Sequence, residues 1–167
     1  MSQRTTFSTT TPLPPGISRQ TVISFLHDHK RMIDLNPLVK ERHTIRRPLH
    51  AAPDELRYTW YSITDHASYL PGKIATGEVT YTCAFNNLPN GLQSHCYAPA
   101  GLDIRQRWLI DEPIQAGVLG LKGVSAKGLY IREDVEILCN RAMTTSVKNT
   151  LKDSHAELVA RLKLKAQ

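Results

Sequence analysis

The chain has 167 residues, of which 41% are apolar and 22% charged, and this ordinary balance argues against a disordered or fibrous protein. Its net charge of +6 comes from lysines and arginines spread along the sequence, so no nucleic-acid-binding surface is expected. Because no apolar run is long enough to cross a membrane and the polar start is unlike a secretory signal, we expect a single cytoplasmic domain over residues 1–167, without integral membrane association.

The first part of the chain predicts a strand followed by a helix. Residues 4–11 are rich in threonine and favour a strand, which PLPPG at 12–16 interrupts. Ser18 is a candidate N-cap for the helix that follows. One apolar stripe then recurs at helical steps: Val22, Phe25, Leu26, His29 and Ile33. This helix should end before Pro37, because the residue preceding a proline is pushed out of the helical region.

The middle of the chain predicts antiparallel strands, since apolar and polar residues alternate between Gly, Pro and Asn breaks. The strands are expected at 38–46, 55–65, 73–85, 91–98, 102–110 and 128–139. After Asn140, helical periodicity returns and continues to Lys165. Its stripe consists of Met143, Val147, Leu151, Leu158 and Leu162. Only the sheet can bury this stripe, so the sequence predicts an α+β fold.

Three segments of the chain resemble a known family. They are TPLPPGISRQTVISFLHDHKRMIDLNPLV, HCYAPAGLDIR and GLYIREDVEILCN. Together with the element order, they are similar to an uncharacterised family of short fungal proteins in the START-like, or SRPBCC, superfamily, which includes pollen allergens, lipid-transfer domains and polyketide cyclases. The resemblance implies a helix-grip fold, in which a curved antiparallel sheet of about seven strands wraps around a long C-terminal helix and leaves a largely preformed cavity for a hydrophobic small molecule.

Strand alternation indicates which side chains face such a cavity. Glu133 lies on an otherwise apolar face of the last strand. It is either a general base or ligand anchor, or a residue near a bulge or paired with a buried arginine. Tyr81 belongs to an inward set with Val79, Cys83 and Phe85. Glu133, Tyr81 and His95 are the candidate catalytic residues.

Aromatic residues on two further strands are candidate ligand-binding residues. Tyr58 and Trp60 are assigned to an inward set with Leu56 and Ser62, as either cavity wall or ordinary core. Trp108 is assigned inward with Ile104, Gln106 and Ile110. Asp103, Arg105 and Arg107 then point to solvent.

The hairpin at LPNG decides the orientation of residues 91–98. With a two-residue turn, Cys83 lies opposite Cys96, and Cys96 faces inward while His95 and Tyr97 face outward. A bulge would instead bring His95 and Tyr97 into the cavity. Both Cys96 and Tyr97 are kept as candidate ligand-binding residues.

The remaining histidines and the cysteines give weaker signals. His43 and His155 are candidate wall residues, since His155 interrupts the apolar stripe of the long helix and His43 matches the parity of its strand neighbours. His27 and His29 are two residues apart on a helix and cannot share one metal. The three cysteines form no CxxC pair, so no metal site is predicted and all are expected to be reduced thiols. Residues 111–128 combine glycines with apolar residues and are predicted to cover the cavity mouth, or simply to connect two strands.

Three functions fit these patterns. The first is a cofactor-free, pericyclase-like cyclase or isomerase that folds a hydrophobic intermediate of secondary metabolism. The second is a non-catalytic carrier or sensor of a lipid, sterol or polyketide. The third is a basic interaction module, which would need clustered positive charge. The resemblance favours the enzyme. The ligand and the oligomeric state stay open, with a homodimer among the options.

Overall fold

The computed structural model of the chain describes residues 1–66, 77–111 and 128–167. Within them, seven strands form one antiparallel sheet in the order β1-β7-β6-β5-β4-β3-β2. The strands are β1 (Ser2–Pro12), β2 (Val39–Ile45), β3 (Thr59–His66), β4 (Glu78–Leu88), β5 (Gly91–Ala98), β6 (Leu102–Asp111) and β7 (Tyr130–Asn140). The helices are α1 (Arg19–Leu26), α2 (His29–Ile33) and α3 (Thr144–Lys165), and the short 3-10 turns are η1 (Pro53–Glu55), η3 (Pro99–Gly101) and η4 (Arg141–Met143).

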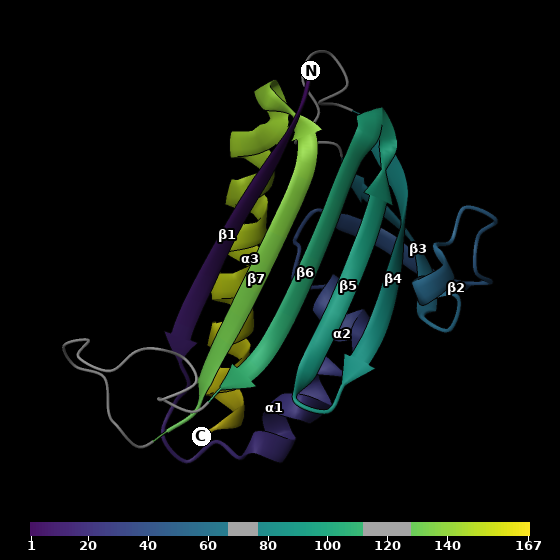
Figure 1. Cartoon of the computed structure of the whole chain (residues 1–167). Helices are drawn as coiled ribbons and strands as arrows, with labels where there is room; N and C mark the ends of the chain where they lie inside the picture. Colours follow the sequence, from purple (N-terminus) through teal and green to yellow (C-terminus); the bar gives the residue numbers. More distant parts are fainter. Residues whose placement is uncertain (67–76, 112–127) are drawn as a thin grey trace.

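All three helices lie behind one face of the bent sheet, with α3 running along β7 and β1, and α1 and α2 behind the central strands (Figure 1). We call this helix-covered side the concave face and the other side the convex face. The predicted α+β fold class is confirmed: a curved antiparallel sheet of seven strands packs around a long C-terminal helix.

The N-terminal helical segment differs from the single helix expected between Ser18 and Pro37. Ser18 does cap α1, and its hydroxyl accepts from the backbone N–H of Thr21 at 3.0 Å. The segment then breaks, because the Asp28 carboxylate accepts from the backbone N–H of Arg31 at 3.2 Å and starts α2 as a second N-cap. The apolar stripe is nevertheless buried on both pieces.

The β4–β5 hairpin has the register predicted for a two-residue turn. Leu88 lies opposite Gly91 and Cys83 opposite Cys96, so Cys96 faces the concave side while His95 and Tyr97 face the convex side. Gly91 is required where β5 starts, since a Cβ there would lie 1.8 Å from the carbonyl oxygen of Trp108.

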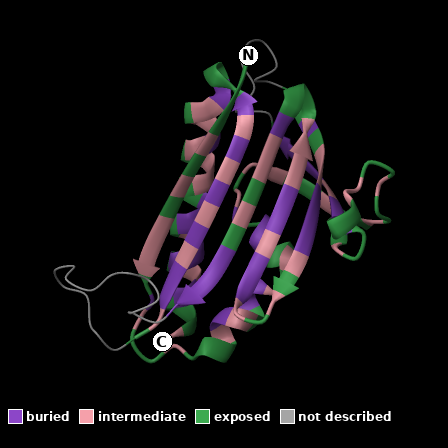
Figure 2. Ribbon diagram, viewed as in Figure 1, coloured by how far each residue is buried: buried purple, intermediate pink, exposed green. Residues whose placement is uncertain are grey.

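Burial along the strands shows how the two faces are covered. Along β7, buried and half-buried residues alternate, as expected for a strand with one covered face. Along β3 and β5, neighbouring residues are buried on both faces (Figure 2). The reason is that the segment 46–58, which joins β2 to β3 and contains η1, covers part of the convex face. We call this segment the β2–β3 loop.

Candidate functional site

A cavity of about 110 Å³ lies between the concave face, α2 and α3. Its wall is mostly apolar. The apolar and sulfur-containing lining residues are Met32, Ile33, Leu35, Ile63, Cys83, Phe85, Cys96, Ala98, Leu102, Ile104, Trp108, Val147 and Leu151. Polar side chains reach it at a few points only, which is the usual lining of a small-molecule site.

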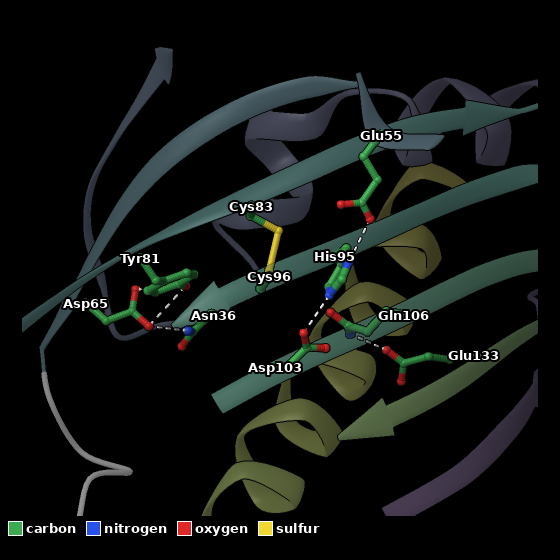
Figure 3. Close-up of a disulfide and its surroundings, with 10 residues drawn as sticks. All are labelled: Asn36, Glu55, Asp65, Tyr81, Cys83, His95, Cys96, Asp103, Gln106 and Glu133. Carbon is green, nitrogen blue, oxygen red and sulfur yellow. Dashed lines mark hydrogen bonds and ion pairs between the residues drawn. A yellow bond between two sulfur atoms is a disulfide. The ribbon is translucent and has the colours of Figure 1, made fainter. Parts of the chain in front are cut away.

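One part of the cavity wall carries a buried carboxylate. Asp65 on β3 is fully buried and accepts from the Tyr81 hydroxyl, with both oxygens 3.2 Å away, and from Asn36 Nδ2 at 3.0 Å (Figure 3). Asn36 is itself fixed, because its Oδ1 accepts from the backbone N–H of Leu38 at 3.0 Å. The three polar side chains therefore converge on one point of an apolar cavity. We call them the Asp65 cluster.

A second buried carboxylate lies one layer behind the cavity. Glu133 on β7 is 1% exposed and accepts from Gln106 Nε2 at 2.8 Å. His155 on α3 lies with Nδ1 3.3 Å from the other carboxylate oxygen and Nε2 2.8 Å from the Thr11 hydroxyl. Trp108 stacks on the His155 ring. Gln106 and Trp108 line the cavity, so Glu133 and His155 support the wall through them.

The predicted residues on β4, on β6 and on the concave side of β5 do lie at the cavity. Tyr81, Cys96 and Trp108 line it, as their assigned parity requires. The cysteines differ from the expectation of reduced thiols: Cys83 and Cys96 form a disulfide in the cavity wall, and only Cys139 among them is free. The physical reason is the register, which places the two thiols directly opposite each other on the same face.

His95 lies on the convex face, so it does not face the cavity. It is nevertheless only 4% exposed, and its ring lies between two carboxylates: Nδ1 is 2.6 Å from a Glu55 oxygen and Nε2 is 2.8 Å from an Asp103 oxygen (Figure 3). The Tyr97 hydroxyl also donates to Glu55. We call Glu55, His95, Tyr97 and Asp103 the convex clasp. Since Glu55 belongs to η1, the clasp fixes the β2–β3 loop to the sheet.

The contacts of the convex clasp shift the pKa of the Tyr97 hydroxyl. Burial, the hydrogen bond to Glu55 and the negative charge of that carboxylate raise the pKa of Tyr97 well above its ordinary value.

Three of the predicted ligand-binding residues lie away from the cavity, in addition to Tyr97. Trp60 is buried on the convex side, where its Nε1 donates to the Glu55 carbonyl oxygen at 3.2 Å and its ring stacks on Tyr97. Tyr58 borders an open hollow of about 360 Å³ on the convex face. His43 is exposed beside Glu41. The parity assigned to β3 is wrong, because Trp60 is buried by the β2–β3 loop and not by the helices.

Three carboxylates of the two polar clusters were missed by the sequence analysis. The correct parity of β3 turns Tyr61, Ile63 and Asp65 to the concave face, so the same error that placed Trp60 inside removed Asp65 from consideration. Asp103 was assigned to solvent but binds His95. Glu55 gave no signal, because no periodicity relates a loop carboxylate to a strand histidine 40 residues later.

Residues 2–167 match a protein family described as a domain of unknown function, DUF7053. The chain belongs to this family. A search among curated proteins finds no match.

Solved structures show what the fold of this DUF7053 chain is similar to. The crystal structure of Ara h 8.0201 has a TM-score of 0.60 at 8% identity, covering 97% of this chain and 98% of that one. An aromatase/cyclase, ZhuI, from Streptomyces sp. R1128 has a TM-score of 0.61 at 9% identity, covering 100% and 97%. An uncharacterised protein from Rhizobium leguminosarum has a TM-score of 0.58 at 8% identity, covering 98% and 97%. At such identities the likeness shows a shared helix-grip fold.

Two further expectations concern the surroundings of the DUF7053 site. The segment expected to cover the cavity mouth, 111–128, lies outside the described residues apart from its two ends. In the part of the chain that is described, no helix is long and apolar enough to cross a membrane.

Proposed function

We propose that the protein binds an apolar small molecule in the concave cavity and acts on it as a cofactor-free isomerase or cyclase, with a hydrophobic natural-product intermediate as the substrate class. The observation that carries this proposal is the Asp65 cluster, a buried carboxylate and a hydroxyl that converge on a mostly apolar cavity. The similarity of the fold to an aromatase/cyclase supports it as analogy.

The Asp65 cluster has the groups that proton transfer at carbon requires. In the proposed reaction, Asp65 takes a proton from a carbon next to a substrate carbonyl, and the negative charge moves to the carbonyl oxygen. Once Asp65 is protonated and no longer accepts from Tyr81, the Tyr81 O–H turns to that oxygen and stabilises it by hydrogen bonding. Return of the proton to a different carbon gives an isomer. Alternatively, the enolate carbon attacks a second carbonyl and closes a ring, and Asp65 then gives its proton to the new alkoxide. Neither the isomerisation nor the cyclisation requires an external oxidant, reductant or metal.

The cavity volume limits what part of a substrate is held. An apolar cavity of about 150 Å³ accommodates benzene, whereas this one has about 110 Å³. We therefore propose that the cavity holds the reacting end of the substrate, or that α3 and its side chains move outward when a larger ligand binds.

A cavity-filling variant tests whether this space is the binding site. Ala98 lines the cavity and is half-buried, so Ala98→Phe places a ring inside it. Ligand extracted from the purified protein and identified by mass spectrometry should be present in the wild type and absent from this variant, with both folded by circular dichroism. Equal ligand recovery from both proteins would refute the assignment of the cavity as the binding site.

A paired comparison tests the chemistry. Tyr81→Phe and Asp65→Asn should retain the bound compound but leave it unconverted, so that its mass or retention differs from that found in the wild type. Tyr58→Phe, which removes a hydroxyl outside the cavity, is the matched control and should behave as the wild type.

The second candidate is a non-catalytic carrier or sensor of a lipid, sterol or polyketide. It is favoured by the apolar lining elsewhere in the cavity and by the position of His95 on the opposite face. A carrier would yield the same compound from the wild type, Asp65→Asn and Tyr81→Phe, in different amounts.

A further inference from the structure

The β2–β3 loop exposes an aliphatic side chain at its tip. The backbone N–H of Ala51 donates to the Pro48 carbonyl oxygen at 3.1 Å, which closes a turn with Leu49 and His50 at its centre. Leu49 is fully exposed, with 109% relative exposure, and Leu56 in the same loop is 42% exposed. Turn positions normally carry polar residues or glycine, whereas this loop exposes two leucines.

Basic residues flank this tip from both arms of the loop. Ile45 and Trp60 are paired across β2 and β3, which brings the two ends of the loop together. Arg46 and Arg47 on one arm and Arg57 on the other are exposed, and none of them makes an ion pair among the described residues. The one exposed carboxylate of the loop is Asp54, since Glu55 is buried in the convex clasp.

The loop is held in place while its tip is exposed. The His50 ring lies 5.7 Å from Trp60 and 5.0 Å from Tyr97, and Glu55 binds His95 and Tyr97. The loop protrudes beside β2 and β3 (Figure 1), and its tip and η1 are exposed in Figure 2. Little conformational entropy would then be lost when the tip binds a surface.

We propose that the β2–β3 loop docks the protein on an anionic lipid bilayer, with Leu49 entering the boundary between headgroups and acyl chains and Arg46, Arg47 and Arg57 contacting lipid phosphates. A bilayer matches both features of the loop, because insertion of an aliphatic side chain and attraction of arginines to lipid phosphates act together at anionic membranes. A nucleic acid would use the arginines but leave Leu49 in water, and the loop presents no exposed Phe, Tyr or Trp for base stacking. The inference does not depend on the proposed catalytic function.

Vesicle co-sedimentation of the full chain tests this inference. The wild type should bind vesicles of phosphatidylcholine mixed with phosphatidylserine, bind pure phosphatidylcholine vesicles far less, and release from the mixed vesicles as salt is raised. Leu49→Asp should weaken binding at least about tenfold. The double variant Arg46→Glu/Arg47→Glu should weaken it by about tenfold or more.

Matched control variants distinguish an effect of the loop surface on vesicle binding from an effect of the protein's net charge. Leu164 at the end of α3 is also exposed, at 68%, so Leu164→Asp makes the same change elsewhere and should bind as the wild type. Lys163→Glu/Lys165→Glu repeats the double charge reversal away from the loop and should have a much smaller effect. Equal losses in loop and control variants, no preference for anionic vesicles, or tighter binding to a nucleic-acid duplex that Leu49→Asp leaves unchanged would each overturn the proposal. Tyr81→Phe should bind vesicles normally, which keeps this result separate from that of the cavity.

Discussion

Removing the imidazole of His95 should destabilise the protein strongly, although His95 lies outside the cavity. In a variant such as His95→Leu, Glu55 loses its ring donor while its side chain stays only 7% exposed. Deleting the partner of a buried charge costs about 3–5 kcal/mol. Asp103 adds little, because its side chain is 29% exposed and water can replace the ring. Tyr97 still donates to Glu55. We therefore expect the lower end of the range, about 3 kcal/mol.

Urea denaturation of the purified variants measures this loss. In thermal denaturation of a protein of this size, a loss of about 3 kcal/mol corresponds to a decrease in Tm of roughly 6–12 °C. The double variant Glu55→Met/His95→Leu removes both buried polar groups and should recover most of the loss, since an apolar pair of similar volume can replace a buried polar pair at little cost. A loss below about 1 kcal/mol for His95→Leu would refute the reasoning. So would a double variant whose destabilisation equals the sum of the two single variants, because it would mean that the two side chains are not coupled.

Three other perturbations have expected outcomes. Because the pKa of Tyr97 is raised in the folded protein, the unfolded chain loses its tyrosine proton first, so stability should fall as the pH rises above about 10, and Tyr97→Phe should reduce that slope in denaturation experiments. Gly91→Ala should lower the free energy of unfolding by about 2 kcal/mol or more, because its Cβ would lie 1.8 Å from a backbone oxygen of Trp108; an unchanged urea midpoint would contradict the register of β5 and β6. Reduction of the Cys83–Cys96 disulfide, which spans 13 residues, should cost up to about 3 kcal/mol, and Cys139→Ser should leave the response to reductant unchanged.

The sheet and its hairpin register could be predicted because their signals are local. The turn at LPNG allows one pairing without a bulge, and that pairing fixed the faces of Cys96 and Tyr97. The parity of β7 was equally clear, since Glu133 interrupts an apolar face whose neighbours on the other face are charged. β7 has one fully covered face, which is the condition under which alternation identifies the buried side, whereas the faces of β5 follow from the hairpin turn.

The polar clusters could not be predicted because they depend on long-range contacts. On β3, aromatic residues occur on both faces, Trp60 under the β2–β3 loop and Tyr61 under the helices, so hydrophobicity alone does not identify the concave face. Glu55 reaches His95 only after the loop has folded back onto the convex face. The disulfide is a different case. The sequence predicted the pairing of Cys83 and Cys96, and only their oxidation state was wrong.

The pairing of β1 with β7 has a consequence for biosynthesis. Ser2 pairs with Asn140 and Pro12 with Tyr130, so β1 leaves the ribosome well before its partner β7 and stays unpaired with it until β7 has been made. At roughly 5–20 residues per second, that interval lasts on the order of ten seconds. During this time the threonine-rich nascent segment has an unsatisfied backbone edge, which chaperones or other nascent chains can contact. Pairing of β1 is therefore a late event, and β1 and β7 become protected together.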